Sequence, residues 1–476
     1  NAIGGLMQLT PDMATVQQAD GQWLEVEVRG VALGASVRVR PGERIGLVDI
    51  RDPKAPQPAG FIQLEGEPTS VAVHRHYALV AVNTSLGFTQ PDGVLAVFDI
   101  RNPAQPKRVA TLPMGGQPDS IAISPRGRYA AVAIENERDE DLNDGLIPQL
   151  PAGFLRIVDL KGQPSRWRTR DVDLTGLAEV APGDPEPEYV SINDQDVAAV
   201  TLQENNAVAE LDIRHGRITA VHGLGYKDHS LSGNELDASD KDNAVTIRNW
   251  PIRGLYQPDA ISNFKHHGKT YLVTANEGDA RAYSGYNEEV RLGSAAYLLD
   301  PAQFPDAASL KQNANLGRLT VSKASGLNPA TGTYQAIYAF GARSFTIWNS
   351  DLKPVYDSGS EFERISAARL PALFNSNHKD NSPDGRSDDK GPEPEGVTVS
   401  ELWGKPYAFV GLERLSAVMV YDLSQPKAPR FVELVSNRNA AAKPPAAEAG
   451  DLGPEGVMVI AAERSPLPGV PLLVVG

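Results

Sequence analysis

The sequence lacks several features that would each point to a particular class of protein. None of its 476 residues is cysteine, which excludes disulfide bonds and thiolate metal sites. No apolar run approaches the ~18 residues that a transmembrane helix needs, so we expect no transmembrane segment. Basic residues are too few to balance the acids, and the net charge of −15 argues against nucleic acid as a partner, because phosphate binding needs a basic face.

Common catalytic signatures are also missing. No Gly-x-Ser-x-Gly nucleophile elbow and no Walker-type phosphate loop occurs in the chain. The first residue is Asn1 rather than Met, which is typical of a processed, exported protein and also fits an artificial boundary. We expect a secreted, periplasmic or cell-surface location.

A short phrase built around a proline recurs along the chain, usually with a carboxylate directly after it. Repetition at long spacing indicates one structural unit stacked several times. The copies are Gln117-Pro118-Asp119, Glu186-Pro187-Glu188, Gln257-Pro258-Asp259, Glu393-Pro394-Glu395 and Gly453-Pro454-Glu455, with a weaker one at Glu67-Pro68-Thr69.

The segment after Asp119 indicates what the unit is. Residues 120–124 and 129–134 are β-rich and flank a Pro-Arg-Gly-Arg turn, and residues 153–160 contain a Val-Asp pair near their end. Four antiparallel strands per unit, joined by Gly, Pro and Asp turns, describe a β-propeller blade. We therefore predict an all-β chain with a β-propeller fold; an open sandwich or two smaller β domains are the alternative.

The spacing of the repeats predicts seven blades. The gap between Pro258 and Pro394 is long enough for a blade without the phrase, with strands at 334–340 and 344–348. We expect strands at 45–50 and 60–64 to complete the last blade and close the ring, which removes sheet edges. An eighth, partial blade is the alternative, since residues 24–28 alternate and could add an outer strand. The predicted domains are an N-terminal extension, 1–43, and one propeller, 44–476, with inserted loops near 223–250, 281–315 and 375–392.

A second acidic residue follows each first one at a regular distance. Glu135 lies 16 residues after Asp119, and Glu413 lies 18 residues after Glu395. Two short strands and a turn fill that length, so both carboxylates should lie at one rim of the blade. Repeated around the ring, the pairs would crowd one mouth of the central channel. The remaining pairs are Glu188 with Glu204 and Asp259 with Glu277.

So many anions raise one another's pKa values or require cations. Ca²⁺ is the expected ion, because it takes six to eight oxygen ligands and needs neither His nor Cys; the alternative is that each carboxylate caps local backbone amides. Basic residues interleave with the acids and could neutralise a bound anion. The candidate metal ligands are Asp119, Glu135, Glu188, Glu204, Asp259, Glu277, Asp279, Asp388, Asp389, Glu395, Glu413 and Glu455, and the candidate anion-binding residues are Arg281, Arg343, Lys390 and Arg414.

Three long phrases make the chain resemble a known family. Residues 271–281 (Tyr-Leu-Val-Thr-Ala-Asn-Glu-Gly-Asp-Ala-Arg), 386–397 and 407–414 look like the choice-of-anchor I family, and the resemblance covers roughly residues 45 to 475. That family includes exported bacterial proteins labelled alkaline phosphatase and mesenchyme-specific cell-surface glycoproteins. The resemblance implies a secreted β-propeller. Members usually continue beyond the position of Gly476 with an Asn-Glu pair and another strand.

Two functions remain open on the sequence. The first is a calcium-dependent phosphoesterase, in which Ca²⁺ bridges the phosphate of a small molecule and a metal-activated water attacks. The basic residues interleaved among the acids favour it slightly. The second is a non-catalytic surface or matrix protein that binds calcium, mineral or a partner through the same mouth. Fold cannot choose between them.

Overall fold

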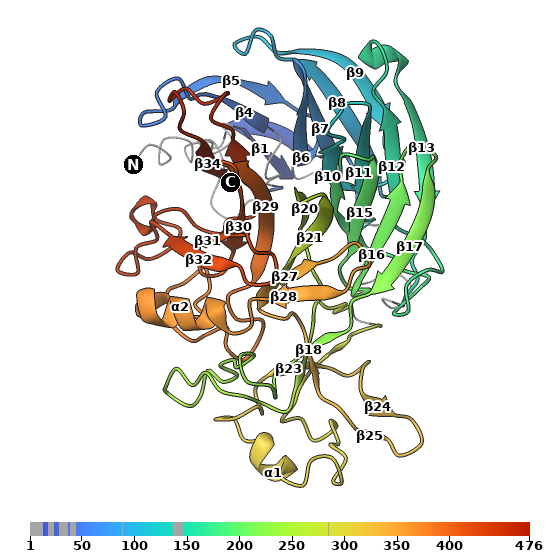
Figure 1. Ribbon diagram of the computed structural model, residues 1–476. Coiled ribbons are helices and arrows are strands. Elements are labelled where there is room, and N and C mark those ends of the chain that lie inside the picture. Colours follow the sequence, from blue (N-terminus) through green and yellow to red (C-terminus); the bar gives the residue numbers. More distant parts are fainter. Residues whose placement is uncertain are drawn as a thin grey trace.

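Short antiparallel strands separated by turns fill most of the chain. The computed structural model describes residues 13–17, 23–27, 37–38, 44–87, 89–136, 146–283 and 285–476, and side chains only from residue 44 onward. These residues form five four-stranded antiparallel sheets, each with its strands in chain order from the inside outward. Figure 1 shows the sheets following one another around a centre, with β6 (Glu67–His74), β10 (Pro118–Ile123), β20 (Ile261–His266) and β29 (Pro394–Leu402) on the inside. A propeller-like arrangement of four-stranded sheets is thereby confirmed.

The five sheets have the following strands. The first contains β6 (Glu67–His74), β7 (Tyr77–Asn83), β8 (Gly93–Asp99) and β9 (Lys107–Pro113). The second contains β10 (Pro118–Ile123), β11 (Tyr129–Ile134), β12 (Phe154–Asp159) and β13 (Arg168–Asp173). The third contains β14 (Pro187–Ile192), β15 (Val197–Leu202), β16 (Ala207–Asp212) and β17 (Arg217–Gly223). The fourth contains β20 (Ile261–His266), β21 (Lys269–Asn276), β27 (Ser344–Trp348) and β28 (Pro354–Asp357). The fifth contains β29 (Pro394–Leu402), β30 (Lys405–Leu412), β31 (Ala417–Asp422) and β32 (Arg430–Val435).

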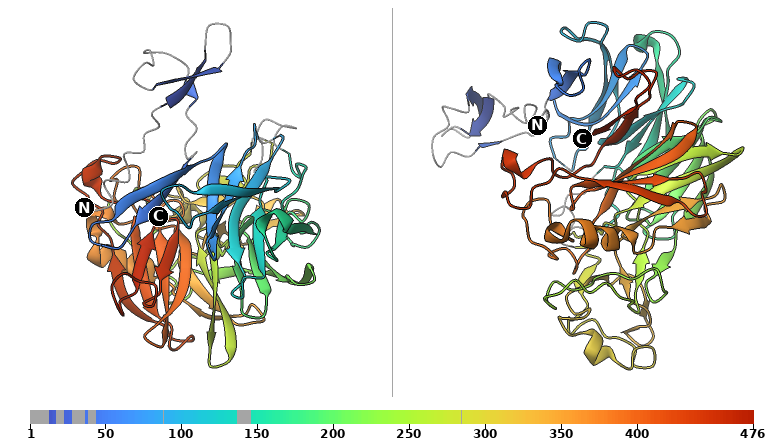
Figure 2. Two further views of the ribbon diagram at one scale, coloured as in Figure 1. Left: turned by 90° about the horizontal axis from the view of Figure 1, so that it is seen from above. Right: turned by 60° about the vertical axis from the view of Figure 1, so that its left-hand side comes forward.

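Two further strand pairs come from the two ends of the chain. Near the C-terminus β33 (Val457–Ile460) pairs with β34 (Leu472–Val475), and near the N-terminus β4 (Arg44–Asp49) pairs with β5 (Gln57–Gln63). Figures 1 and 2 place β34 beside β4 and β5. The strand expected at 24–28 is instead part of a separate sheet of β1 (Met13–Gln17), β2 (Trp23–Glu27) and β3 (Val37–Arg38).

The structure corrects the prediction of an extra blade between Pro258 and Pro394. Its expected strand at 344–348 is β27, which pairs with β21 and so is the third strand of the sheet that β20 begins. The expected strand at 334–340 is broken into β25 (Thr333–Tyr334) and β26 (Tyr338–Ala339), which lie outside that sheet. The long gap is therefore an insertion within one sheet. The described residues between Pro258 and Pro394 therefore do not form the separate blade on which the count of seven depended.

The inserted segments build a small unit of their own. Five strands from residues 226–339 form one sheet, and its core contains Trp250, Tyr297 and Leu316. In Figure 1 this unit extends below the ring, together with α1. Its elements are β18 (Tyr226–Asp228), β19 (Arg253–Leu255), β22 (Glu289–Arg291), β23 (Thr320–Ser322), β26 and α1 (Ala307–Leu310), with β24 (Leu327–Asn328) and β25 forming a hairpin beside it.

Hydrophobic side chains fill the spaces between neighbouring sheets. The second strands are the most buried, as in β7 where Leu79, Val80 and Ala81 have no exposed surface. Strands covered on both faces read as continuous apolar runs, which is the pattern of these segments. Helix α2 (Glu361–Arg369) packs Phe362 into the core of the fourth and fifth sheets. No helix in the described parts of the chain is both long and apolar enough to span a membrane.

The strand pairing defines two rims of the ring. Pro118 at the start of β10 pairs with Ile134 at the end of β11, and Ile123 pairs with Ala130 at the opposite ends of these strands. First strands begin, and second strands end, at what we call the mouth rim. The turns between first and second strands, and between third and fourth strands, lie at the other end, which we call the turn rim. Six residues of strand separate the rims by about 20 Å.

Candidate functional site

A β-bulge sets the position of the first carboxylate in three of the phrases. The pairing of β10 with β11 shifts register between Pro118 and Ile121, so that Asp119 lies outside the regular ladder. The same shift occurs around Glu188 in the third sheet and Glu395 in the fifth. Bulges redirect side chains and are frequent near sites. The proline of the phrase begins the strand, and the bulge turns the next side chain toward the mouth.

The second carboxylate of each pair ends the neighbouring strand. The Glu135 N–H donates to the Gln117 carbonyl (3.1 Å), and the Glu413 N–H donates to the Glu393 carbonyl (2.9 Å). Both members of a pair thus lie at the mouth rim, as their spacing predicts. The larger spacing in the fifth sheet follows from strand length, because β29 and β30 have 9 and 8 residues whereas β10 and β11 have 6 each.

Three carboxylates from two sheets converge on one point of the mouth. Oxygen atoms of Asp119, Glu135 and Glu188 all lie within 4.8 Å of one another, and we call this group the three-acid site. All three side chains are half-buried. Burial, followed by the charges of Glu135, Asp119 and Glu204, raises the pKa of Glu188 well above its ordinary value. Carboxylates that lie this close together raise one another's pKa values, which favours binding of a proton or a cation.

Glu204 adjoins the three-acid site and is itself almost entirely buried. Its Oε2 atom has no hydrogen-bond partner among the described residues. Burial and then Glu186 and Asp279 raise the pKa of Glu204 well above its ordinary value. A buried carboxylate oxygen without a partner is unfavourable, so this atom is a plausible point of attachment for a proton or an ion.

Arg281 lies behind this side of the mouth, where it joins the inserted segment to the third sheet. Its Nε donates to Asp184 Oδ2 (3.0 Å) and Glu186 Oε1 (3.1 Å), and its other nitrogens donate to the carbonyls of Glu204 (3.2 Å) and Asp184 (2.9 Å). The side chain has no exposed surface. The guanidinium is thus fully engaged by protein groups, and the expectation that Arg281 neutralises a bound phosphate gains no support from its position.

A second group on the mouth combines acids with bases. Oxygen atoms of Glu277, Glu393 and Glu413 lie within 4.8 Å of one another. Arg414 donates to Glu393 Oε2 (2.8 Å) and is paired with Glu413 Oε1 (2.9 Å), while Arg386 donates to Glu393 Oε1 (2.8 Å). We call these five residues and Lys390 the mixed-charge site.

Glu393 is the centre of the mixed-charge site. Burial would raise its pKa, but Lys390, Arg386 and Arg414 lower it below its ordinary value. Glu277 behaves in the opposite way: its pKa is about 8, because burial dominates over Lys390. Lys390 is paired with Asp279 (3.1 Å). This half of the mouth is therefore neutralised from within the protein.

The other mouth carboxylates lie between the two sites. Burial and then Glu277 raise the pKa of Asp259 well above its ordinary value. The pKa of Glu395 is raised to about 10 by burial and by Glu277, Asp259, Glu413 and Glu455. These mutual effects place the predicted acids of several sheets around one channel mouth.

Arg343 and two loop acids are engaged in contacts outside the three-acid site. The Arg343 guanidinium is buried and donates to Glu363 Oε1 (2.6 Å) and to the Asp237 and Ser387 carbonyls (2.6 and 2.8 Å). These contacts fix the inserted loops to α2, and the expected role of Arg343 toward a bound anion stays a prediction. Asp388 is paired with Arg291 (2.9 Å) and Arg318 (2.8 Å), and Asp389 is paired with Arg386 (2.8 Å). Neither acid belongs to the three-acid site.

Three candidate functional residues were not predicted from the sequence. Glu186 and Glu393 precede the prolines of their phrases and are buried against arginines. His378 comes from an inserted loop, and its Nδ1 lies 3.2 Å from Glu413 Oε1. A signal for the first two exists, since Glu or Gln precedes the proline in every copy of the phrase except Gly453-Pro454. No local pattern marks His378.

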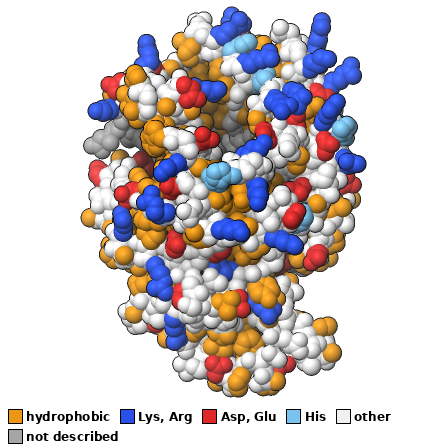
Figure 3. Space-filling model, viewed as in Figure 1, with side chains coloured by type: hydrophobic (Ala, Val, Ile, Leu, Met, Phe, Trp, Pro, Cys, Tyr) orange, Lys and Arg blue, Asp and Glu red, His pale blue; other side chains and the backbone are white. Residues whose placement is uncertain are grey.

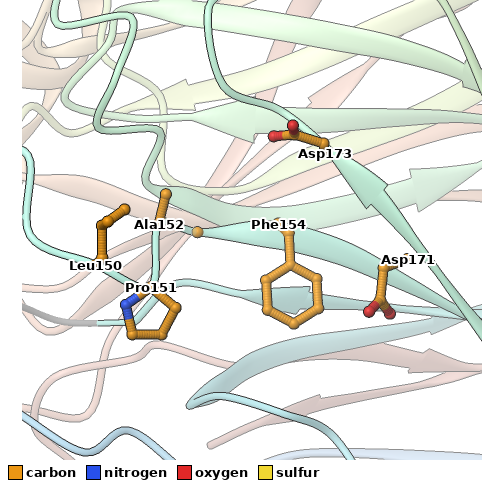
Figure 4. A pocket seen from close by; sticks show the side chains of 7 residues that line it. Leu150, Pro151, Ala152, Phe154, Asp171 and Asp173 are labelled. Atoms are coloured by element: carbon orange, nitrogen blue, oxygen red, sulfur yellow. The ribbon is translucent and has the colours of Figure 1, made fainter.

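One recess in the described part of the chain lies away from the mouth. It has a volume of about 690 Å³ and lies on the outside of the second sheet, between Leu150–Gly153 and the strands β12 and β13. Figure 4 shows Phe154 and Pro151 at its wall and the carboxylates of Asp171 and Asp173 at one side. The recess is open and mainly apolar. None of the clustered mouth carboxylates lines it, so the candidate site is defined by charge rather than by cavity volume.

Comparison with known proteins gives a family and two curated relatives. Residues 35–426 match the family described as Choice-of-anchor I domain. Gigasin-3a of Magallana gigas is 37% identical over 122 residues, which cover 24% of this chain and 43% of that protein. Mesenchyme-specific cell surface glycoprotein of Strongylocentrotus purpuratus is 27% identical over 234 residues, covering 42% and 30%. The chain thus spans less than half the length of these relatives.

Solved structures resemble the chain in fold alone. The β-propeller domain of Cps50 (Swd1) from Myceliophteria thermophila has 10% identity and a TM-score of 0.35, with 92% of this chain and 85% of that chain covered. The WD40 repeats of RRP9 have 10% identity and a TM-score of 0.30, covering 78% and 80%.

Proposed function

Because the chain belongs to the choice-of-anchor I family, we propose that it is a secreted or cell-surface propeller whose acidic mouth binds a divalent cation, with Ca²⁺ as the ion. The observation that carries this proposal is the approach of Asp119, Glu135 and Glu188 oxygens to within 4.8 Å of one another. A relative named as a cell surface glycoprotein supports the location.

The donor atoms of the three-acid site suit Ca²⁺. The three side chains offer carboxylate oxygens only, which are the ligands that Ca²⁺ prefers, and bidentate carboxylates can fill most of its six to eight positions. Glu204, whose Oε2 has no partner in the described structure, is the fourth candidate ligand. When bound, the ion supplies positive charge that neutralises the acids and attracts anionic groups of a partner. We propose an anionic matrix or mineral component as that partner.

Binding is better supported than catalysis. The phosphoesterase hypothesis depended on four basic residues interleaved with the acids, and two of these, Arg281 and Arg343, are buried in structural ion pairs. Lys390 and Arg414 remain at the mouth, but each is paired with a carboxylate there. An anion would have to displace these pairs.

The proposal predicts calcium-dependent stability. With Ca²⁺ at 100 times its dissociation constant, binding to the folded state alone adds about 2.7 kcal/mol to the free energy of unfolding. We expect a rise in the melting temperature of the full chain on adding Ca²⁺ after EDTA treatment, measured by differential scanning calorimetry. Glu188→Gln should lose most of this rise. Glu179→Gln, an exposed substitution of the same kind, should keep it.

The outcome that would contradict the proposal is equally concrete. If the wild-type melting temperature does not change with Ca²⁺, the chain has no stabilising cation site. If Glu188→Gln and Glu179→Gln respond like the wild type, a cation binds somewhere other than the three-acid site.

A calcium-dependent phosphoesterase is the second candidate function. The observation that favours it is the mixed-charge site, where Lys390 and Arg414 stand beside Glu277 and Glu413, with His378 within 3.2 Å of Glu413. On this hypothesis the full chain releases phosphate from p-nitrophenyl phosphate or phytate with Ca²⁺, and EGTA abolishes the release. Arg414→Gln should then reduce turnover at least tenfold, since removing a single charge-stabilising contact costs about that much or more. Absence of chelator-sensitive release from neutral to alkaline pH would eliminate this candidate and leave cation binding unaffected.

We also infer that the ring closes through the two ends of the chain. The strand pairs β33–β34 and β4–β5 together would make one four-stranded sheet, with β34 beside β4. That arrangement gives six blades in place of the seven expected from spacing. It also covers the two sheet edges that remain exposed when the pairs are separate.

A further inference from the structure

The blade repeat carries a second charged motif, at the end of the third strand. An aspartate, an aliphatic residue and a basic residue follow one another there. The Asp49 and Asp99 carboxylates accept hydrogen bonds from the backbone N–H of the residue two positions later (3.0 and 3.1 Å), which directs the basic side chain outward. Arg51 and Arg101 are 91% and 71% exposed. The copies are Asp49-Ile50-Arg51, Asp99-Ile100-Arg101, Asp159-Leu160-Lys161 and Asp212-Ile213-Arg214.

These basic residues all lie on the turn rim, opposite the mouth, and other bases join them there. The turns of the first two sheets contain eight cationic residues and two acids, in a chain whose net charge is −15. Both acids are engaged, Asp99 by Arg101 and Asp159 by Arg170 (2.8 Å). The cationic residues are Arg75, Arg101, Lys107, Arg126, Arg128, Lys161, Arg166 and Arg168, and every one of them is exposed.

The turns of neighbouring sheets touch, so the basic residues of the first two sheets share one surface. Tyr77 Oη donates to Gln163 Oε1 (3.3 Å), and His74 lies edge-on to Trp167 with ring centres 6.2 Å apart. These contacts join the first turn of the first sheet to the last turn of the second. In the other direction, Arg170 donates to the Arg214 carbonyl (3.3 Å), which joins the second sheet to the third.

Most of this positive charge is not used within the protein. Arg75, Arg126, Lys161, Arg166 and Arg168 form no ion pair with any residue that the structure describes. Figure 3 shows Lys and Arg side chains gathered over the upper right of the molecule, where Figure 1 places β9, β12 and β13. Unpaired arginines on one face are suited to phosphate groups, which they bind through two parallel hydrogen bonds.

A tryptophan stands exposed on the same rim. Trp403 lies in the turn between β29 and β30 with 72% of its surface exposed and a φ angle of 52°. A non-glycine residue with positive φ is strained. The exposed indole ring would be removed from water only by contact with a partner. Tryptophan side chains favour the boundary between lipid and water.

We propose that the turn rim is a docking surface for an anionic lipid bilayer. The cations spread over the turns of several sheets rather than collecting in a groove, which fits a flat layer of phosphate groups better than a single polymer strand. Trp403 would enter the interfacial layer, while the acidic mouth on the opposite rim faces away from the lipid. The inference does not depend on the proposed calcium site.

Vesicle binding of the full chain tests the proposal. The vesicles contain phosphatidylcholine with roughly one-third phosphatidylserine, and EDTA is present throughout so that calcium bridging at the mouth contributes nothing. We expect the protein to sediment with these vesicles at low salt, and to be released by high salt or by pure phosphatidylcholine. The double substitution Arg126→Glu with Arg168→Glu should weaken the partition coefficient at least tenfold, because each juxtamembrane base contributes about 1 kcal/mol.

Two controls distinguish binding through the basic residues of the turn rim from binding that depends only on the net charge of the protein. The double substitution Lys323→Glu with Lys443→Glu changes the net charge equally at exposed positions outside the turn rim, and should alter binding less than about twofold. Trp403→Ala should weaken binding severalfold without changing its dependence on salt. Equal losses in the two double variants would overturn the proposal. Binding to dextran sulfate but not to vesicles would also overturn it, because it would indicate a soluble polyanion as the partner. Self-association through the turn rim in sedimentation velocity, without lipid binding, would overturn it as well.

Discussion

Replacing Arg281 with methionine should lower the free energy of unfolding by about 3–5 kcal/mol. The substitution leaves Asp184 and Glu186, both almost entirely buried, without the guanidinium that lies 3.0 and 3.1 Å from them. Breaking a buried ion pair by removing its cation is strongly destabilising. Chemical denaturation of the full chain, followed by tryptophan fluorescence, measures the loss.

Arg369 provides the matched control. It forms an ion pair of similar length with Glu433 (2.6 Å), but the two side chains are 50% and 52% exposed. Arg369→Met should therefore change stability by less than about 1 kcal/mol. If Arg281→Met were as mild as this control, the account of Arg281 as a structural residue would be wrong, and a role toward a ligand would become open again.

Replacing Glu395 with glutamine should stabilise the calcium-free protein at pH 8, by about 2–4 kcal/mol. The pKa of Glu395 is raised from an ordinary value of 4.5 to about 10. Between these values the folded protein holds a proton that the unfolded chain releases, so wild-type stability is highest below about pH 4.5 and falls as the pH rises toward 10. Glutamine removes the carboxylate and this term.

Measurements at two pH values in EDTA test this prediction. The variant's advantage in free energy of unfolding should be small at pH 5 and larger at pH 8. Glu401→Gln, an exposed position on the same strand β29, should be neutral at both. An advantage of Glu395→Gln that shrinks with rising pH would contradict the assignment of Glu395 as a protonated member of the mouth.

The periodic part of this protein can be predicted from its sequence. The strand predicted at 129–134 is β11 with the same bounds, because β-rich runs bounded by Gly and Pro turns specify local strands. The pairing of Asp119 with Glu135 follows from the return of a hairpin to its starting rim. Both inferences depend on the spacing of residues close together in sequence, and the same spacing recurs in several copies of the repeat.

The parts that escaped prediction depend on contacts between distant segments. The insertion between β21 and β27 has nearly the length of a blade, and spacing alone cannot tell an insertion from a blade. Arg343 follows that insertion and is buried because α2 and the loops carrying Asp237 and Ser387 meet around its guanidinium. His378 approaches Glu413 for the same kind of reason. The basic partners of the mouth carboxylates come from loops that are distant in sequence. The positions of the acids could therefore be predicted from the repeat, but the residues that pair with them could not.

The most direct test of the central claim is anomalous diffraction from crystals of the full chain grown with Ca²⁺, or with Mn²⁺ as a stronger scatterer. The account predicts an anomalous peak among the carboxylates of Asp119, Glu135 and Glu188, and its loss in Glu188→Gln crystals grown alongside. A map with no peak at these three residues at saturating metal, or with its strongest peak at the mixed-charge site, would contradict it.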